Sequence, residues 1–183
     1  MKKHLNTIVV TALLMFVATA HAWDPREVDK LAAGSDQAKA AMLEKDPSMQ
    51  RFFDSAAGWV IIPTVGKGGI GIGGARGKGL LYENDAPAAI VTLTQLTIGF
   101  QWGGQAYSEF IFFQNADALT DFKRGNYELG AQASAVAVTM GASADVNYSG
   151  GVAIFTQAKG GLMYEATVGG QKFKVELVGD AAE

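Results

Sequence analysis

Residues 58–83 read GWVIIPTVGKGGIGIGGARGKGLLYE, and this stretch decides how the rest of the chain can fold. Eight of the fourteen residues from 66 to 79 are glycine. Each glycine inside a helix costs roughly 0.5–1 kcal/mol relative to alanine, whereas glycine suits tight turns and close backbone approach. The stretch therefore predicts a strand, a cationic glycine loop and a second strand, with the glycines shaping a β-hairpin.

The same glycines suggest a nucleotide site, but their context argues against one. Gly69, Gly71 and Gly74 have the spacing G-x-G-x-x-G, yet a strand-like segment follows them where a dinucleotide fingerprint needs a helix. A P-loop lysine is followed by Ser or Thr, and both Lys67 and Lys78 are followed by glycine. The sequence favours a hairpin over either phosphate cradle.

The first 22 residues have the three parts of a secretory signal. Lys2 and Lys3 precede an apolar core at residues 5–18, and residues 20–22 form an A-x-A cleavage signature. The apolar core is shorter than the roughly 20 residues that a spanning helix needs. The chain has no cysteine, so neither a disulfide nor a lipidated N-terminal cysteine is available. We expect cleavage before Trp23 and a periplasmic or secreted protein of one domain.

Composition leaves few catalytic options for the mature chain. The two histidines, His4 and His21, lie in the leader, and the chain has no cysteine. The mature chain therefore cannot form a Ser-His-Asp triad, a cysteine nucleophile or most zinc or copper ligand sets. Loss of Lys2 and Lys3 reduces 15 basic residues to 13, against 18 acidic ones. This balance disfavours nucleic acid. We expect no catalytic residue, no metal site, no cofactor and no nucleic-acid partner.

Two regions differ in their predicted secondary structure. Residues 23–57 predict three short helices, at 25–31, at 36–44 after Ser35, and after Asp46-Pro47, with Phe52 and Phe53 of the third packing on a sheet. Residues 58–183 predict a glycine-rich β region. Strands are expected at 107–114, 127–146, 152–157, 162–168 and 173–178, and a helix capped by Asn115 at 116–123.

The strand pattern at 91–102 changes parity. Val91 and Leu93 alternate with threonines, and Leu96, Ile98, Phe100 and Trp102 alternate in the opposite phase. A β-bulge near Thr94 would turn both halves inward. The expected fold is α+β, with N-terminal short helices packed on a twisted antiparallel sheet that can close toward a barrel.

Acidic residues offer weak candidate sites. Residues 145–150 resemble the first half of an EF-hand, but Thr156 stands where a bidentate Glu is required, so a hairpin turn is favoured. Asp117 and Asp121 share a helix face and are best explained as solvated. Glu109 lies within an apolar strand; burial would raise its pKa, although an exposed edge position is the favoured expectation.

Basic residues offer the better case. Lys67, Arg76 and Lys78 lie in or beside the glycine loop, and Lys159 precedes a second glycine pair. Lysine and arginine beside exposed backbone N–H groups can hold phosphate. The segment GLLYE at 79–83 also recurs as GLMYE at 161–165, which suggests two related cationic turns.

Four segments in order resemble the SYLF lipid-binding domains, described also through fungal actin-patch proteins. They are the glycine-rich run at 66–79, FQWGGQ at 100–105, NYELGA at 126–131 and AKGGL at 158–162. The resemblance covers roughly residues 31–177. It implies a non-catalytic domain that binds phospholipid head groups, and actin binding in some fungal relatives.

The leading hypothesis is thus a periplasmic module that contacts anionic phospholipid through Lys67, Arg76, Lys78 and Lys159. The alternative is an envelope structural or interaction module that pairs with itself or with a partner through its strands. A carboxylate-dependent hydrolase using Glu109 and Asp117 is a distant third.

Overall fold

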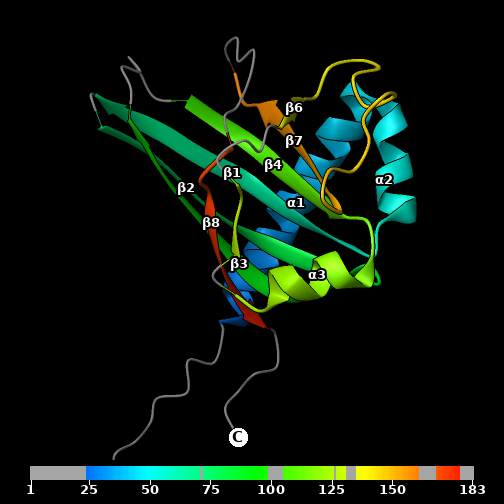
Figure 1. Ribbon diagram of the computed structural model, residues 1–183, viewed down its shortest axis with the longest axis horizontal. Coiled ribbons are helices and arrows are strands. Elements are labelled where there is room, and N and C mark those ends of the chain that lie inside the picture. Colours follow the sequence, from blue (N-terminus) through cyan, green and yellow to red (C-terminus); the bar gives the residue numbers. More distant parts are fainter. Residues whose placement is uncertain are drawn as a thin grey trace, which may run out of the picture.

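A computed structural model describes residues 24–70, 72–98, 105–125, 127–130, 135–160 and 168–177. In these residues the strands form one sheet in the order β5-β8-β3-β2-β1-β4-β7-β6 (Figure 1). The strands are β1 (Gly58–Ile70), β2 (Ile72–Glu83), β3 (Ala86–Ile98), β4 (Gln105–Phe113), β5 (Tyr127–Glu128), β6 (Val136–Ala137), β7 (Val152–Ala158) and β8 (Lys172–Leu177). The helices are α1 (Pro25–Lys45), η1 (Pro47–Met49), α2 (Gln50–Ser55) and α3 (Ala116–Lys123). The expected α+β class is confirmed.

The sheet is strongly curled into a half-barrel. Gln171, just before β8, and Glu109, on β4, belong to parts of the sheet four strand steps apart, about 19 Å along a flat sheet. Their side chains nevertheless meet, because Gln171 Nε2 donates a hydrogen bond of 2.9 Å to Glu109 Oε2. The side chains on the concave face, here called the inner face, therefore reach across an enclosed interior.

The outer, convex face packs against α1, η1 and α2. Met42, Met49, Phe52, Phe110 and Phe112 are all buried there. Phe52 lies 5.3 Å from Phe112 between ring centroids. The expectation that Phe52 packs on the sheet is confirmed.

Helix α1 corrects one expectation. The sequence predicts two short helices at 25–31 and 36–44, but one helix runs through both and through Gly34. A Cβ at Gly34 would lie only 3.2 Å from the ring of Pro63, so glycine lets the helix approach β1 closely. Packing against the sheet thus outweighs the cost of a helical glycine.

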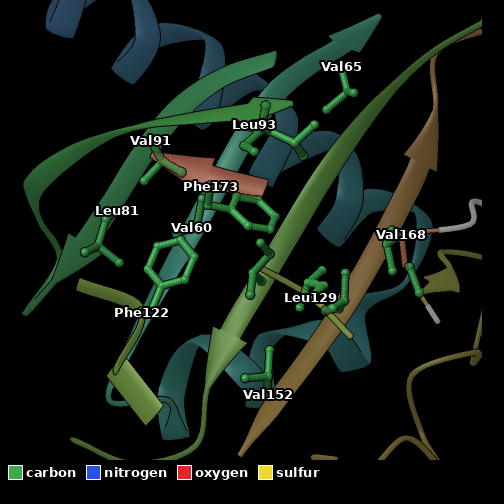
Figure 2. Packing of buried hydrophobic residues seen from close by; sticks show 14 of the residues in the cluster. Val60, Val65, Leu81, Val91, Leu93, Phe122, Leu129, Val152, Val168 and Phe173 are labelled. Atoms are coloured by element: carbon green, nitrogen blue, oxygen red, sulfur yellow. The ribbon is translucent and has the colours of Figure 1, made fainter. Parts of the chain in front are cut away.

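The inner face encloses the second apolar cluster. Figure 2 shows Val60, Leu81, Val91 and Phe173 of four strands directed into the same space as Phe122 of α3. Phe122 is 1 % exposed and its ring centroid lies 5.5 Å from that of Phe173. Asn115 caps α3 as expected, because its side chain accepts a hydrogen bond from the Ala118 N–H.

The glycine-rich stretch forms the hairpin that the sequence predicts, but its glycines lie in strands rather than in a loop. β1 and β2 are paired from Trp59 and Tyr82 to Ile70 and Ile72. Glycine is required at position 79, where the two strands approach closely: a Cβ on Gly79 would overlap the carbonyl oxygen of Ile61. Strand pairing therefore extends through the segment that was expected to form a cationic glycine loop.

The predicted bulge near Thr94 is wrong. β3 pairs with β2 without interruption from Ala89 to Ile98, and the nearby irregularity lies in β1, between Ile61 and Thr64. Strand parity therefore continues through Thr94. Leu96 points outward and is 86 % exposed, while Leu93 is fully buried on the inner face.

The C-terminal part differs more from expectation. Within the strand predicted at 127–146, the described residues form only β5 and β6, with turns at 140–145. β6 pairs with β7 in parallel, so the sheet is mixed rather than wholly antiparallel. The predicted strand at 173–178 is confirmed as β8. The leader, residues 99–102 of the alternating run, and all but the last residue of the strand expected at 162–168 lie outside the described residues.

Candidate functional site

The structure divides the four predicted head-group residues between two faces of the sheet. Arg76, Lys78 and Lys159 are exposed on the outer face. Lys67 is the Cα partner of Ala75 and therefore lies on the inner face, where it is 8 % exposed. These four residues cannot act as one patch.

The outer residues lie in register across the sheet. Arg76 pairs with Thr94 of β3, which pairs with Lys172 of β8. In the other direction Arg76 pairs with Gly66 of β1, Gly66 pairs with Ala106 of β4, and the backbone N–H of Lys159 donates to the Ala106 oxygen at 2.8 Å. One transverse row thus carries three cations.

Leu96 projects beside this row. It lies two residues beyond Thr94 on the same strand and is the Cα partner of Gly74, so it is diagonal to Arg76. Diagonal residues on one face of a sheet lie about 7–8 Å apart between Cα atoms. We call Arg76, Lys78, Leu96, Lys159 and Lys172 the outer basic surface.

Acidic residues neutralise only part of this surface. Lys78 Nζ lies 2.6 Å from Glu27 Oε1 of α1, and Lys172 Nζ lies 3.5 Å from Glu128 Oε2. Lys159 Nζ donates to Thr64 Oγ1 at 2.8 Å. In the described part of the chain, neither Arg76 nor Lys159 has an acidic partner. These two charges are therefore free to attract an anion.

Lys67 has a different environment. Burial lowers the pKa of its ammonium group. Gln95, 4 % exposed, lies in the same inner row, because Gln95 and Lys67 both pair with Ala75. A membrane surface could reach this position only by entering the half-barrel.

Glu109 is the centre of a buried polar cluster, and the expectation of an exposed edge position is wrong. It is 0 % exposed, because it points into the enclosed interior, and β4 lies between β1 and β7 rather than at an edge of the sheet. Burial raises its pKa to about 8, although the hydrogen bond from Gln171 opposes the shift. Tyr107 OH lies 3.4 Å from Gln171 Nε2, and burial also raises the pKa of this phenol.

The structure places the other acidic candidates apart from Glu109. Asp117 is exposed at the start of α3, whereas Glu109 is enclosed, so the two carboxyl groups do not line one cleft. Asp121 is exposed and pairs with Arg124 at 3.0 Å. Asp145 lies in a turn, but the segment is not the expected hairpin turn, because the flanking strands β6 and β7 pair in parallel. The described residues contain no group of three or more potential His, Asp or Glu metal ligands.

A pocket of about 330 Å³ lies where the two edges of the curled sheet face each other. Leu129 follows β5 on one side, and Val152 and Ile154 belong to β7 on the other. Its lining is mixed, because Tyr127, Asn147 and Ser149 join the aliphatic side chains. None of the predicted head-group residues lines it.

Comparison with protein families gives one match. Residues 94–176 match the Ysc84 family model, described as Las17-binding protein actin regulator. Over these residues the match agrees with the resemblance to SYLF domains. A comparison with curated protein sequences found no significant relative. The family is one of lipid-binding and actin-regulator domains.

The SYLF match extends from β3 to β8 and therefore includes Leu96, Lys159 and Lys172 of the outer basic surface. It begins after the glycine hairpin that carries Arg76 and Lys78. Sequence reasoning missed Leu96 and Lys172. Leu96 could have been found by continuing the alternation from Val91 and Thr92 without a bulge, which places it on the face of the threonines. Lys172 could have been found from the alternation of lysines with apolar residues in KFKVEL at 172–177.

Proposed function

We propose that this protein is a non-catalytic periplasmic module that docks on anionic phospholipid membranes through the outer basic surface. The proposal takes the lipid-binding character of the SYLF family and assigns it to one face of the half-barrel. It replaces the earlier set of four cations by Arg76, Lys78, Lys159 and Lys172, with Leu96, and leaves Lys67 out.

The single observation that carries the proposal is the position of Leu96. Leu96 is 86 % exposed and lies on the same face as Arg76, which has no acidic partner among the described residues, so an apolar side chain and a positive charge are combined there. Peripheral membrane proteins use this combination, because apolar burial and attraction to anionic lipid add. No helix in the described residues has the length and apolar character needed to span a bilayer.

Binding to anionic lipid requires a locally basic surface on this protein. The mature chain as expected from the sequence has more acidic than basic residues, so attraction to anionic lipid depends on the placement of charges. A basic residue near an anionic membrane contributes about 1 kcal/mol. Loss of Arg76 and Lys159 together should therefore weaken binding about 30-fold.

Vesicle sedimentation tests the proposal. We expect the protein to sediment with vesicles of phosphatidylglycerol and phosphatidylcholine, less with phosphatidylcholine alone, and less as salt increases. The double variant Arg76→Ala/Lys159→Ala should bind about 30-fold more weakly. Leu96→Ala should weaken binding without changing its salt dependence.

Two controls make the test specific. Lys45→Ala/Arg124→Ala removes the same charge from exposed positions outside the outer basic surface and should bind like the wild type. Lys67→Ala should also bind like the wild type. Equal recovery with neutral vesicles, or equal losses in both double variants, would reject the surface. A mass that rises with protein concentration, without lipid binding, would instead support the interaction module.

A further inference from the structure

Three buried side-chain oxygens around Glu109 lack hydrogen-bond partners in the part of the chain that the structure describes. They are Glu109 Oε1, Thr156 Oγ1 and Gln171 Oε1. Their residues are 0 %, 1 % and 0 % exposed. Buried polar atoms in native proteins are nearly always paired, with protein, water or ligand, so three together require an explanation.

The three residues form one cluster. Thr156 of β7 is the Cα partner of Glu109 of β4, which places their Cβ atoms about 5 Å apart on the inner face. Gln171 contacts the other carboxyl oxygen of Glu109 at 2.9 Å. The three oxygens do not satisfy one another, although they belong to neighbouring side chains. A separate small group could satisfy all of them.

The chemistry of the three atoms restricts that group. All are oxygens, and two are pure acceptors when Glu109 is ionised. An ionised Glu109 has no counter-charge in the described residues, because the neighbouring side chains Tyr107, Thr156 and Gln171 are neutral. Lys67 pairs with Gln105, four residues before Glu109 on β4, or about 13 Å along the strand.

We propose that Glu109, Thr156 and Gln171 bind a monovalent cation inside the half-barrel, either an alkali metal ion or a primary ammonium group. Carboxylate, amide and hydroxyl oxygens are the ligands of hard cations. One carboxylate balances one positive charge, whereas a divalent ion would leave excess charge in a buried site. The site lies on the inner face and is independent of the outer basic surface.

The raised pKa of Glu109 agrees with this chemistry. Burial disfavours the carboxylate without a counter-ion and raises its pKa to about 8. Below that pH, a proton occupies the carboxyl group when no cation does. A cation competes with that proton. Among the described residues, Tyr107 lies beside Glu109 on the inner face and Lys67 lies about 13 Å further along it, and neither forms an ion pair with Glu109.

Thermal unfolding at pH 8.5 tests the site. Choline chloride is replaced by NaCl, KCl or methylammonium chloride at constant ionic strength, which separates metal from ammonium and both from general salt effects. A bound cation should raise the Tm by about 3–5 °C for each tenfold increase above its Kd. Equal Tm values in all four salts, as expected for an ordered water molecule, would overturn the proposal.

Variants locate the response. Glu109→Gln should have the same Tm in every salt, and Thr156→Val, which keeps the carboxylate, should need about tenfold more cation. Glu176→Gln, an exposed residue paired with Lys174, should respond like the wild type. A salt response retained in Glu109→Gln would refute the assignment. If that variant does not fold, calorimetric titration of the wild type with the three salts replaces it, and absence of binding heat and of any Tm response would reject the site.

Discussion

The close pairing of β1 and β2 predicts different effects of alanine at two glycines of residues 58–83. A Cβ at Gly79 would overlap the carbonyl oxygen of Ile61 and lie 2.7 Å from the Cα of Ile62. Both contacts are with backbone, which cannot rotate away as a side chain can. A Cβ at Gly66 would meet nothing within 4 Å. Alanine should therefore be disruptive at one position and harmless at the other.

The magnitude follows from what must move. Carbon atoms in ordinary contact are about 3.5–4.0 Å apart, so β1 would have to shift by roughly 1 Å at Ile62. Ile61 and Ile62 are 2 % and 0 % exposed and belong to the outer and inner clusters, so the shift disturbs both. Overpacking costs about 1–3 kcal/mol, occasionally more, and we expect about 3 kcal/mol for Gly79→Ala.

Gly66→Ala is the matched control, since it changes the same residue type in the same hairpin. Replacing a strand glycine whose backbone an alanine can adopt should raise the free energy of unfolding by up to about 1 kcal/mol. Urea unfolding followed by far-UV circular dichroism measures both variants. The Tm of Gly79→Ala should also fall by about 6–12 °C. Equal destabilisation of the two variants, or none in Gly79→Ala, would refute the reasoning.

Two further predictions concern pH. The pKa of Glu109 in the folded protein, about 8, exceeds its ordinary value of 4.5. Without alkali cations, the free energy of unfolding should therefore fall as the pH rises from 4.5 to 8, by up to about 1.4 kcal/mol per pH unit. Urea unfolding at several pH values should show this slope in the wild type but not in Glu109→Gln; parallel slopes would contradict it. Burial would raise the pKa of Asp46, but hydrogen bonds from Ser48 and Ser143 outweigh it and lower the pKa to about 2. This stabilisation is present above pH 3.8 and should be lost as pH falls toward 2, by about 2–3 kcal/mol. Asp46→Ala should lose stability at neutral pH and show a smaller acid-induced decrease; an unchanged acid profile would contradict it.

The parts of the fold that the sequence predicts correctly have strong local signals. Asn115 identifies the start of α3, and the run from Phe110 to Phe113 identifies a strand buried on both faces. The glycine density identifies a hairpin. In each case neighbouring residues alone determine the conformation, so no knowledge of distant contacts is needed.

The misassigned parts depend on distant contacts. Gly34 suggests a helix break, but the close approach to Pro63 makes it part of α1. The run at 127–146 alternates like a strand, yet its turn at 140–145 is held by Asp46, whose Oδ2 accepts a hydrogen bond of 3.1 Å from the Ser143 N–H. A partner 97 residues away leaves no local trace in the sequence.

The faces on which Lys67 and Arg76 lie depend on whether the glycines form a loop or paired strands. In a loop, Lys67 and Arg76 could share a surface. In the paired strands, position 67 pairs with position 75, and paired residues point to the same face of the sheet. Arg76, next to Ala75, must point to the opposite face from Lys67. Arg76 and Lys78 therefore lie with Leu96 on the exposed outer face. Lys67 instead faces the interior that contains Glu109. Lys67→Ala and Arg76→Ala should therefore separate in the vesicle assay, and equal effects of the two changes would contradict the register of the hairpin itself.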